Sequence, residues 1–334
     1  MRVTLCGVRG STPAPGADYA RVGGNTSCVA VCHGDEHRPR LVLDAGTGLR
    51  AVTSMLDGAP FDGTILLGHL HWDHTHGLPF FAAADHPLAR TRVLLPAQGA
   101  PAIDLVARFM SPPSFPIGPL GLRGAWSFES IDEGEHDIEG FAVLALEIPH
   151  KGGRTFGYRV SDGSATIAYL SDHGPYGAFG PGPDGLGPYH RSALELCAGA
   201  DVLIHDAQHT AEELPARGSF GHSAVGYPVE LARRCGVPRV LLFHHDPERT
   251  DDDVAAIERS LQASCAAGGG VAVEAGVEGM TIDLPGPSVA PSEAGRGQTE
   301  QRRSGGASAS TLRRRGSAGI RSSSSGGDGR GSRR

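Results

Sequence analysis

The sequence lacks paired cysteines and long apolar runs. Its six cysteines are scattered and form no CxxC pair, which argues against a cysteine-based zinc site. No apolar run approaches the roughly 20 residues of a membrane-spanning helix, and the N-terminal segment Met1–Val8 is too mixed in character for a secretory signal. We therefore expect a cytoplasmic protein without a membrane partner, in which the cysteines are small buried hydrophobic residues.

The net charge of −7 is unevenly distributed along the 334 residues. From Gly286 onward ten arginines face three acidic residues, so this segment carries +7 and the rest of the chain −14. The segment consists mainly of Gly, Ser and Arg and cannot bury enough apolar surface to offset its ordering entropy. We predict a folded domain over residues 1–285 and a disordered basic tail over residues 286–334. The acidic domain argues against a surface that coats nucleic acid, whereas the arginines of the tail could bind a polyanion.

Within residues 1–285, short apolar runs come first in a meander and later alternate with helical patterns, which predicts an α/β layered fold. Thr250 is a typical helix start, because its side chain can cap the helix and the aspartates after it favour the positive end. The expected strands are Val3–Gly7, Ser27–Cys32, Leu41–Asp44, Thr64–Leu67, Arg92–Leu95, Phe141–Glu147, Phe156–Val160, Thr166–Leu170, Val202–His205, Arg239–Phe243 and Val271–Glu274. The expected helices are Leu49–Leu56, Ala100–Phe109, Tyr189–Cys197, Ser223–Arg234 and Asp252–Ala266.

The densest group of potential metal ligands is His69-Leu70-His71-Trp72-Asp73-His74, directly after a predicted strand. Imidazole and carboxylate groups that converge on one point are the usual ligands of a transition metal. Because side chains alternate along an extended chain, His69 and His71 should point the same way. The chain then turns, so Asp73 and His74 can face a second metal. The spacing therefore predicts a metal centre with two positions.

This HxHxDH motif and the order of the residues after it resemble the metallo-β-lactamase superfamily. The resemblance extends over nearly all of residues 1–285 and implies a four-layered αββα sandwich. Pro247 favours His244 over the neighbouring His245 as the last ligand, and Asp44 is expected to support the site from behind the ligands. By this resemblance, one metal is held by His69, His71 and His150, the other by Asp73, His74 and His244, and Asp172 bridges the two.

The resemblance also implies the cofactors and the reaction. Two divalent ions are expected, with zinc as the default for an imidazole-rich site and manganese or iron as alternatives. Two ions about 3.5–4 Å apart can share a hydroxide that attacks the substrate. The expected activity is therefore that of a binuclear metal-dependent hydrolase.

A second pair of motifs resembles the phosphodiesterase branch, which includes tRNase Z and the phosphoribosyl cyclic phosphate diesterases. The segment Val202–Gln208 precedes Gly221-His222-Ser223. The resemblance implies that His222 protonates the leaving oxygen with Asp206 as its partner, so that Asp73, His222 and Asp206 form the catalytic set. The alternative for His222 is a structural place at the start of the predicted helix. Arg9 and Arg21, in glycine-rich segments, are either phosphate contacts or ordinary surface arginines.

The leading hypothesis is hydrolysis of a small or cyclic phosphodiester. A tRNase Z-like endoribonuclease is the alternative within the branch, but that family inserts an arm between its third histidine and bridging aspartate. Here these positions are His150 and Asp172, too close in sequence for two strands and an arm. A glyoxalase-type thioester hydrolase shares the ligands without needing the Asp206–His222 pair, and a non-catalytic nucleotide-binding sensor is a further class. The Pro-rich segment Ser111–Leu120 is either a wall of the substrate cavity or a plain connector. Homodimer formation is left open.

Overall fold

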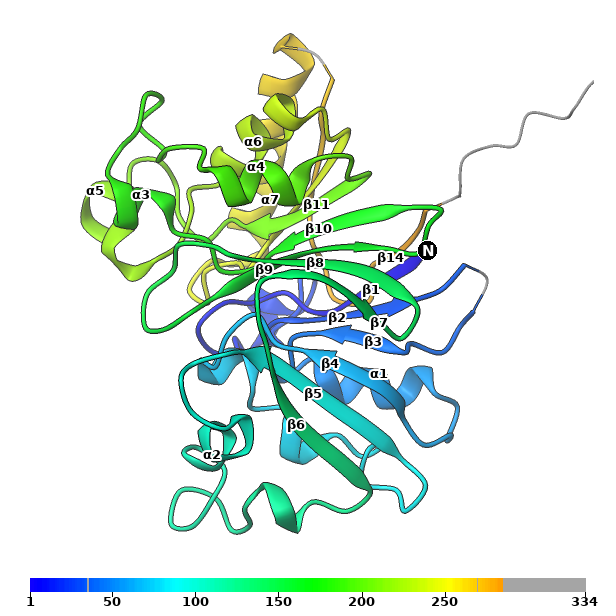
Figure 1. Ribbon diagram of the computed structural model, residues 1–334. Helices are drawn as coiled ribbons and strands as arrows, with labels where there is room; N and C mark the ends of the chain where they lie inside the picture. The colour runs from blue at the N-terminus through cyan, green and yellow to red at the C-terminus, as the bar shows by residue number, and fades with distance from the viewer. Residues whose placement is uncertain (35, 269, 285–334) are drawn as a thin grey trace, which may run out of the picture. The chain divides into compact units, whose positions relative to one another are not determined.

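The computed structural model describes residues 1–34, 36–268 and 270–284, so the predicted basic tail over residues 286–334 lies outside the described residues. The described chain forms two seven-stranded sheets, each with three antiparallel and three parallel strand pairs (Figure 1). The first sheet has the order β14 (Thr281–Asp283), β1 (Arg2–Gly7), β2 (Cys28–Cys32), β3 (Leu41–Leu43), β4 (Asp62–Leu66), β5 (Arg90–Pro96), β6 (Ala125–Ile131). The second has the order β13 (Ala272–Ala275), β12 (Arg239–Phe243), β11 (Val202–Asp206), β10 (Thr166–Leu170), β9 (Phe156–Ser161), β8 (Phe141–Glu147), β7 (Gly134–Ile138).

The two sheets pack face to face, and helices cover their outer faces. Strand β3 shows how the layers arise, because Leu41 and Leu43 join the core between the sheets while Val42 joins the core on the outer face. Side chains alternate along a strand, so a strand buried on both sides needs an uninterrupted apolar run. The outer core of the first sheet contains α1 (Leu49–Met55) and α2 (Ala102–Ala107), and that of the second contains α4 (Arg191–Cys197), α6 (Tyr227–Cys235) and α7 (Asp251–Gly268). The chain therefore has the four-layered αββα arrangement that the sequence predicted.

Several predicted elements match the structure residue for residue, namely β8, β10 and β12. The start of α7 is also confirmed: the Asp253 main-chain N–H donates to Thr250 Oγ1 at 3.2 Å, and the Thr250 N–H donates to Asp253 Oδ2 at 2.9 Å. Strands β6 and β7 were missed because they are largely exposed and have no continuous apolar run. Strand β14 and the short helices α3 (Pro175–Phe179) and α5 (Leu214–Arg217) were also missed.

One predicted helix boundary was wrong. We expected a helix from Ser223, but α6 begins at Tyr227 and has Pro228 in its first turn, where a missing N–H costs nothing. Ser223 is buried before the helix, and its hydroxyl donates to the His173 carbonyl. His222 therefore does not stand at a helix N-terminus.

All six cysteines are free; five are buried and Cys235 is half-buried, close to the expectation. Among the described residues no helix has the length and apolar character needed to cross a membrane.

Candidate metal centre

The predicted site residues come from loops at the carboxyl ends of strands in both sheets. Asp44 directly follows β3, and the His69–His74 motif follows β4. Across the core, Asp172 follows β10, Asp206 ends β11, and His244 directly follows β12. Since neighbouring parallel strands end at the same edge of a sheet, the fold brings these residues to one rim of the sandwich.

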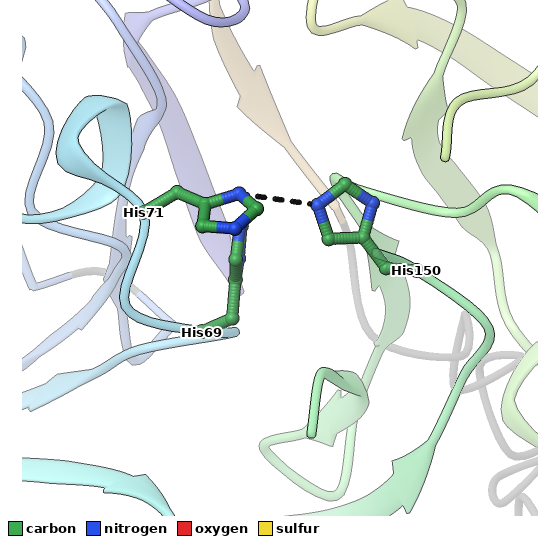
Figure 2. A group of neighbouring side chains, drawn as sticks. All are labelled: His69, His71 and His150. Atoms are coloured by element: carbon green, nitrogen blue, oxygen red, sulfur yellow. Dashed lines mark hydrogen bonds between the residues drawn. The ribbon is translucent and has the colours of Figure 1, made fainter. Parts of the chain in front are cut away.

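The first group consists of His69, His71 and His150, whose rings converge from two loops (Figure 2). The His71 Nδ1 and His150 Nε2 atoms are 3.3 Å apart, and the ring centroids of His69 and His71 are 4.3 Å apart. One potential ligand atom of each residue lies within 4.8 Å of the others. The group therefore has the three-imidazole composition that suits zinc.

The second group consists of Asp73, His74, Asp172 and His244, all buried. The Oδ2 atom of Asp172 lies 2.9 Å from His74 Nε2 and 3.4 Å from His244 Nε2. Its Oδ1 atom instead lies 3.6 Å from His150 Nε2 and 3.8 Å from His69 Nε2, in the first group. One carboxylate thus presents a separate oxygen to each group.

Two of the histidines are hydrogen-bonded at their other nitrogen, and a third lies close to a carboxylate there. His74 Nδ1 lies 2.8 Å from Asp44 Oδ2. His150 Nδ1 donates to the Gly221 carbonyl at 2.7 Å, and His244 Nδ1 donates to Gln208 Oε1 at 3.1 Å. Asp44 is fixed in turn by the Gly68 N–H, the Tyr169 hydroxyl and the Ser171 hydroxyl. These contacts leave Nε2 of each ring directed at the cluster, as metal ligands require.

The electrostatics of the cluster differ between its two groups. Burial lowers the pKa of His69 well below its ordinary value and that of His150 to about 4. His74 and His244 are also buried, but nearby carboxylates, Asp172 foremost, outweigh that cost and raise the pKa of His244 to about 9. Although burial alone would raise the pKa of Asp172, the histidines hold it well below its ordinary value. The second group therefore keeps its two carboxylates ionised and holds protons on His74 and His244, and a metal cation would displace these protons.

The donor set fits divalent cations. Within the described part of the chain, both ring nitrogens of His69 and the Oδ2 atom of Asp172 are buried without a hydrogen-bond partner. Burying a polar atom without a hydrogen-bond partner costs free energy, so such atoms in proteins normally have a partner. Here they belong to a cluster of imidazoles and carboxylates that could hold metal ions, and bound ions would supply that partner.

His222 and Asp206 lie beside this cluster. His222 Nδ1 donates to Asp206 Oδ2 at 2.7 Å, while Asp206 Oδ1 accepts the main-chain N–H groups of Gln208 at 3.0 Å and Ser223 at 3.3 Å. The His222 ring also borders a cavity of about 340 Å³ that Asp73 and Asp172 line. The structure thus places the predicted acid, His222, at the cavity beside the cluster, while its partner Asp206 is fully buried at the Nδ1 side of the ring.

The sequence analysis assigned no role to two further residues of the site, Ser11 and Gln208. The Ser11 main-chain N–H donates to Asp73 Oδ2 at 2.7 Å, and its hydroxyl accepts from Gln208 Nε2 at 3.1 Å. Ser11 has φ 63°, while Asp44 and His244 have φ 59° and 56°, conformations that are rare for residues other than glycine. Such strain persists where the surrounding contacts enforce it, which is common at functional sites.

The structure also distinguishes the alternatives at three other residues. His244 lies in the cluster, whereas His245 Nε2 donates to the Gly276 carbonyl at 3.0 Å and points away. Arg9 fits neither alternative, a phosphate contact or a surface arginine, because it is fully buried and donates to main-chain carbonyls such as that of Gly23 at 2.8 Å. Arg21 is exposed and paired with Asp252, so it is a surface arginine.

Comparison with known proteins agrees with this geometry. The family model described as Beta-lactamase superfamily domain matches residues 39–245, which include the whole span from Asp44 to His244. The chain belongs to the metallo-β-lactamase superfamily. It is a metal-dependent hydrolase, and the His/Asp cluster is where divalent ions can bind.

Relatives and solved structures are consistent with this membership. Ribonuclease Z of Lacticaseibacillus casei (strain BL23) is 26% identical over 271 residues, covering 71% of this chain and 85% of the relative. The structure of human tRNase Z, short form, has a TM-score of 0.57 at 21% identity, covering 85% of this chain and 100% of that one. A diphosphatase from the PhnP family has a TM-score of 0.61 at 14% identity, covering 85% and 98%. At these identities the two structures show the shared fold.

Proposed function

We propose that the protein is a binuclear phosphodiesterase that hydrolyses a small or cyclic phosphodiester. One ion would be held by His69, His71 and His150, the second by Asp73, His74 and His244, with Asp172 between them. The observation that carries this proposal is the division of the Asp172 carboxylate, whose Oδ1 faces one group and Oδ2 the other. Zinc suits this donor set of five histidines and two aspartates, and the ions would polarise the phosphate and lower the pKa of a water molecule.

The chain's own residues account for the proton that the leaving group needs. Asp206 accepts from His222 Nδ1, which leaves Nε2 as the atom that can give a proton to a substrate in the cavity. The carboxylate fixes the orientation of the ring, as a general acid requires. A thioester hydrolase has no need of this pair, because a thiolate leaves without protonation. The pair therefore favours an oxygen leaving group, as in a phosphodiester.

The structure around His150 and Asp172 favours a compact substrate. The intervening residues form β9 and β10, joined by a tight turn in which Asp162 Oδ1 accepts the Ser164 and Ala165 N–H groups at 2.9 Å. Nothing is inserted between these strands that could grip a large RNA. The names of the relatives, ribonuclease Z and tRNase Z, nevertheless make a tRNase Z-like endoribonuclease the second candidate.

The test is a comparison of kcat/KM for bis-p-nitrophenyl phosphate, 2′,3′-cyclic and 3′,5′-cyclic nucleotides and a 3′-extended tRNA. We expect turnover of the generic diester and a preference for a cyclic nucleotide over the tRNA. A tRNA preference of tenfold or more would favour the endoribonuclease. If the protein binds metal but hydrolyses none of these diesters, both the phosphodiesterase and the endoribonuclease proposals are wrong. The non-catalytic nucleotide-binding sensor would then remain. His136→Ala, at a half-buried histidine in β7 outside the cluster, is the control for non-specific effects of losing a ring.

A further inference from the structure

Trp72 is an exposed aromatic residue inside the motif that supplies the cluster. It lies between His71 and Asp73, and 66% of its surface is accessible. Its indole stacks on the His76 ring, with centroids 5.6 Å apart and planes 20° apart. Large apolar side chains are normally buried, so an exposed ring beside catalytic residues is informative. His76 supports one side of the indole and makes it a flat aromatic platform.

The platform stands where two cavities meet. Trp72, Leu70 and His71 line the cavity of about 340 Å³ that contains Asp172 and His222. The same three residues line a second cavity of about 430 Å³, which extends to Gln98, Arg108 and Phe109. A ligand whose phosphate lies in the first cavity can therefore place its neighbouring group against the indole. The second cavity combines a planar ring with amide and guanidinium groups, which suits a polar heterocycle better than an alkyl chain.

The two arginines of the second cavity differ in their partners. Arg154 is engaged, because it donates to Glu147 Oε2 at 2.9 Å and to the Ala97 carbonyl at 3.1 Å. Arg108 is exposed, and its guanidinium has no hydrogen-bond or ion-pair partner within residues 1–34, 36–268 and 270–284. An arginine is well suited to bind phosphate through two parallel hydrogen bonds. The guanidinium of Arg108 can therefore bind a second anionic group of the same ligand.

We propose that Trp72 stacks on the nucleobase of a nucleotide substrate and that Arg108 binds a further phosphate of that nucleotide. The proposal rests on the proposed phosphodiesterase function and names its substrate class. Stacking of a base on an aromatic side chain is worth about 1–3 kcal/mol, or roughly 5- to 150-fold in affinity. This magnitude is large enough to select a nucleotide over a sugar phosphate that lacks the base.

The test uses the fact that the chain has only two tryptophans. In Trp126→Phe, Trp72 is the single indole; Trp126 itself lies on the edge strand β6. Adenosine 5′-monophosphate should quench this fluorescence in a saturable manner, whereas ribose 5-phosphate, which differs only by the base, should bind at least about fivefold more weakly. The reciprocal variant, Trp72→Phe, should show no quenching. Equal binding of both phosphates, or quenching in Trp72→Phe, would overturn the stacking proposal.

The role of Arg108 is tested in the same Trp126→Phe protein by comparing adenosine 5′-diphosphate with the monophosphate. The diphosphate should bind about two- to fivefold more tightly, the range of an exposed ion pair, and Arg108→Ala should remove this gain. Arg191→Ala is the matched control, because Arg191 is an exposed arginine at the start of α4. A gain that persists in Arg108→Ala would overturn this part. Nucleotide binding without hydrolysis of any diester would instead contradict the proposed function and leave the stacking intact.

Discussion

The Asp206 carboxylate lies 2.7 Å from His222 Nδ1 and orients that ring toward the cavity of the metal cluster. Two main-chain N–H groups hold the other carboxylate oxygen, so the ring rests on a fixed support. The contacts of Asp206 therefore orient His222 as a general acid requires. The role of the acid can be separated from that of the metals, because neither His222 nor Asp206 belongs to the proposed ligand set.

His222→Ala should keep its metal but lose roughly 10²–10⁴-fold in kcat on diesters with alkoxide leaving groups. A basic alkoxide needs a proton as it departs, whereas p-nitrophenolate needs little help, so the loss on bis-p-nitrophenyl phosphate should be much smaller. Asp206→Asn should show the same leaving-group dependence with a smaller loss. Steady-state kinetics on the two substrate types check this, and equal losses on both would mean that His222 only binds charge.

Asp172→Ala should lower the metal content at both positions and abolish activity. The physical reason is that this one side chain presents a separate oxygen to each group. Asp137→Ala, at an exposed aspartate in β7, is the control. Elemental analysis of the purified variants gives the metal stoichiometry, and a full complement of metal in Asp172→Ala would show that this residue is not the bridge.

The sequence alone predicted site residues that are close to one another along the chain, and it predicted strands that have a continuous apolar pattern. The HxHxDH motif and the buried strands β8, β10 and β12 could be predicted because their residues are close in sequence or uniformly apolar. The contact of Ser11 with Asp73 spans 62 positions and that with Gln208 spans 197, and no local pattern signals either. The edge strands β6 and β7 were missed because most of their side chains are exposed, so their sequences contain no continuous apolar run. The burial of Arg9 could not be predicted either, because the glycines around it in the sequence do not indicate whether its side chain is buried.

Metal binding should release protons and strengthen as the pH rises toward 9. The carboxylates around His244 raise its pKa to about 9 in the metal-free protein, so below that pH a metal must displace a proton from this ring. For one displaced proton the apparent affinity should increase up to about tenfold per pH unit between pH 7 and 9, and then level off. Calorimetric titration in buffers of different ionisation enthalpy measures the released protons. An absence of proton release at pH 7.5 would contradict the raised pKa of His244 in the metal-free protein.

Arg9→Ala should destabilise the fold rather than weaken substrate binding. The guanidinium is fully buried and donates to the carbonyls of Gly23 and Arg249, at 2.8 and 2.7 Å. Removing one partner of a buried charged network costs about 3–5 kcal/mol. Arg21→Ala is the matched control, because its ion pair is exposed and should contribute no more than about 1 kcal/mol. Urea denaturation gives both free energies, and equal values would contradict a structural role for Arg9.

The salt dependence of turnover should distinguish a small substrate from a tRNA. A protein that neutralises many phosphates loses affinity steeply with salt, whereas a ligand with one or two charges does so weakly, so KM for a cyclic nucleotide should change little between about 50 and 200 mM salt. The domain of residues 1–285 carries −14, and it should therefore repel a long polyanion. Deleting residues 286–334 should leave the melting temperature and the cyclic-nucleotide kinetics nearly unchanged, because every proposed ligand precedes the tail. If a 3′-extended tRNA is instead the better substrate, with a steep salt slope that vanishes when the arginine-rich tail is deleted, then the tail takes the place of the missing arm and the endoribonuclease is the correct function.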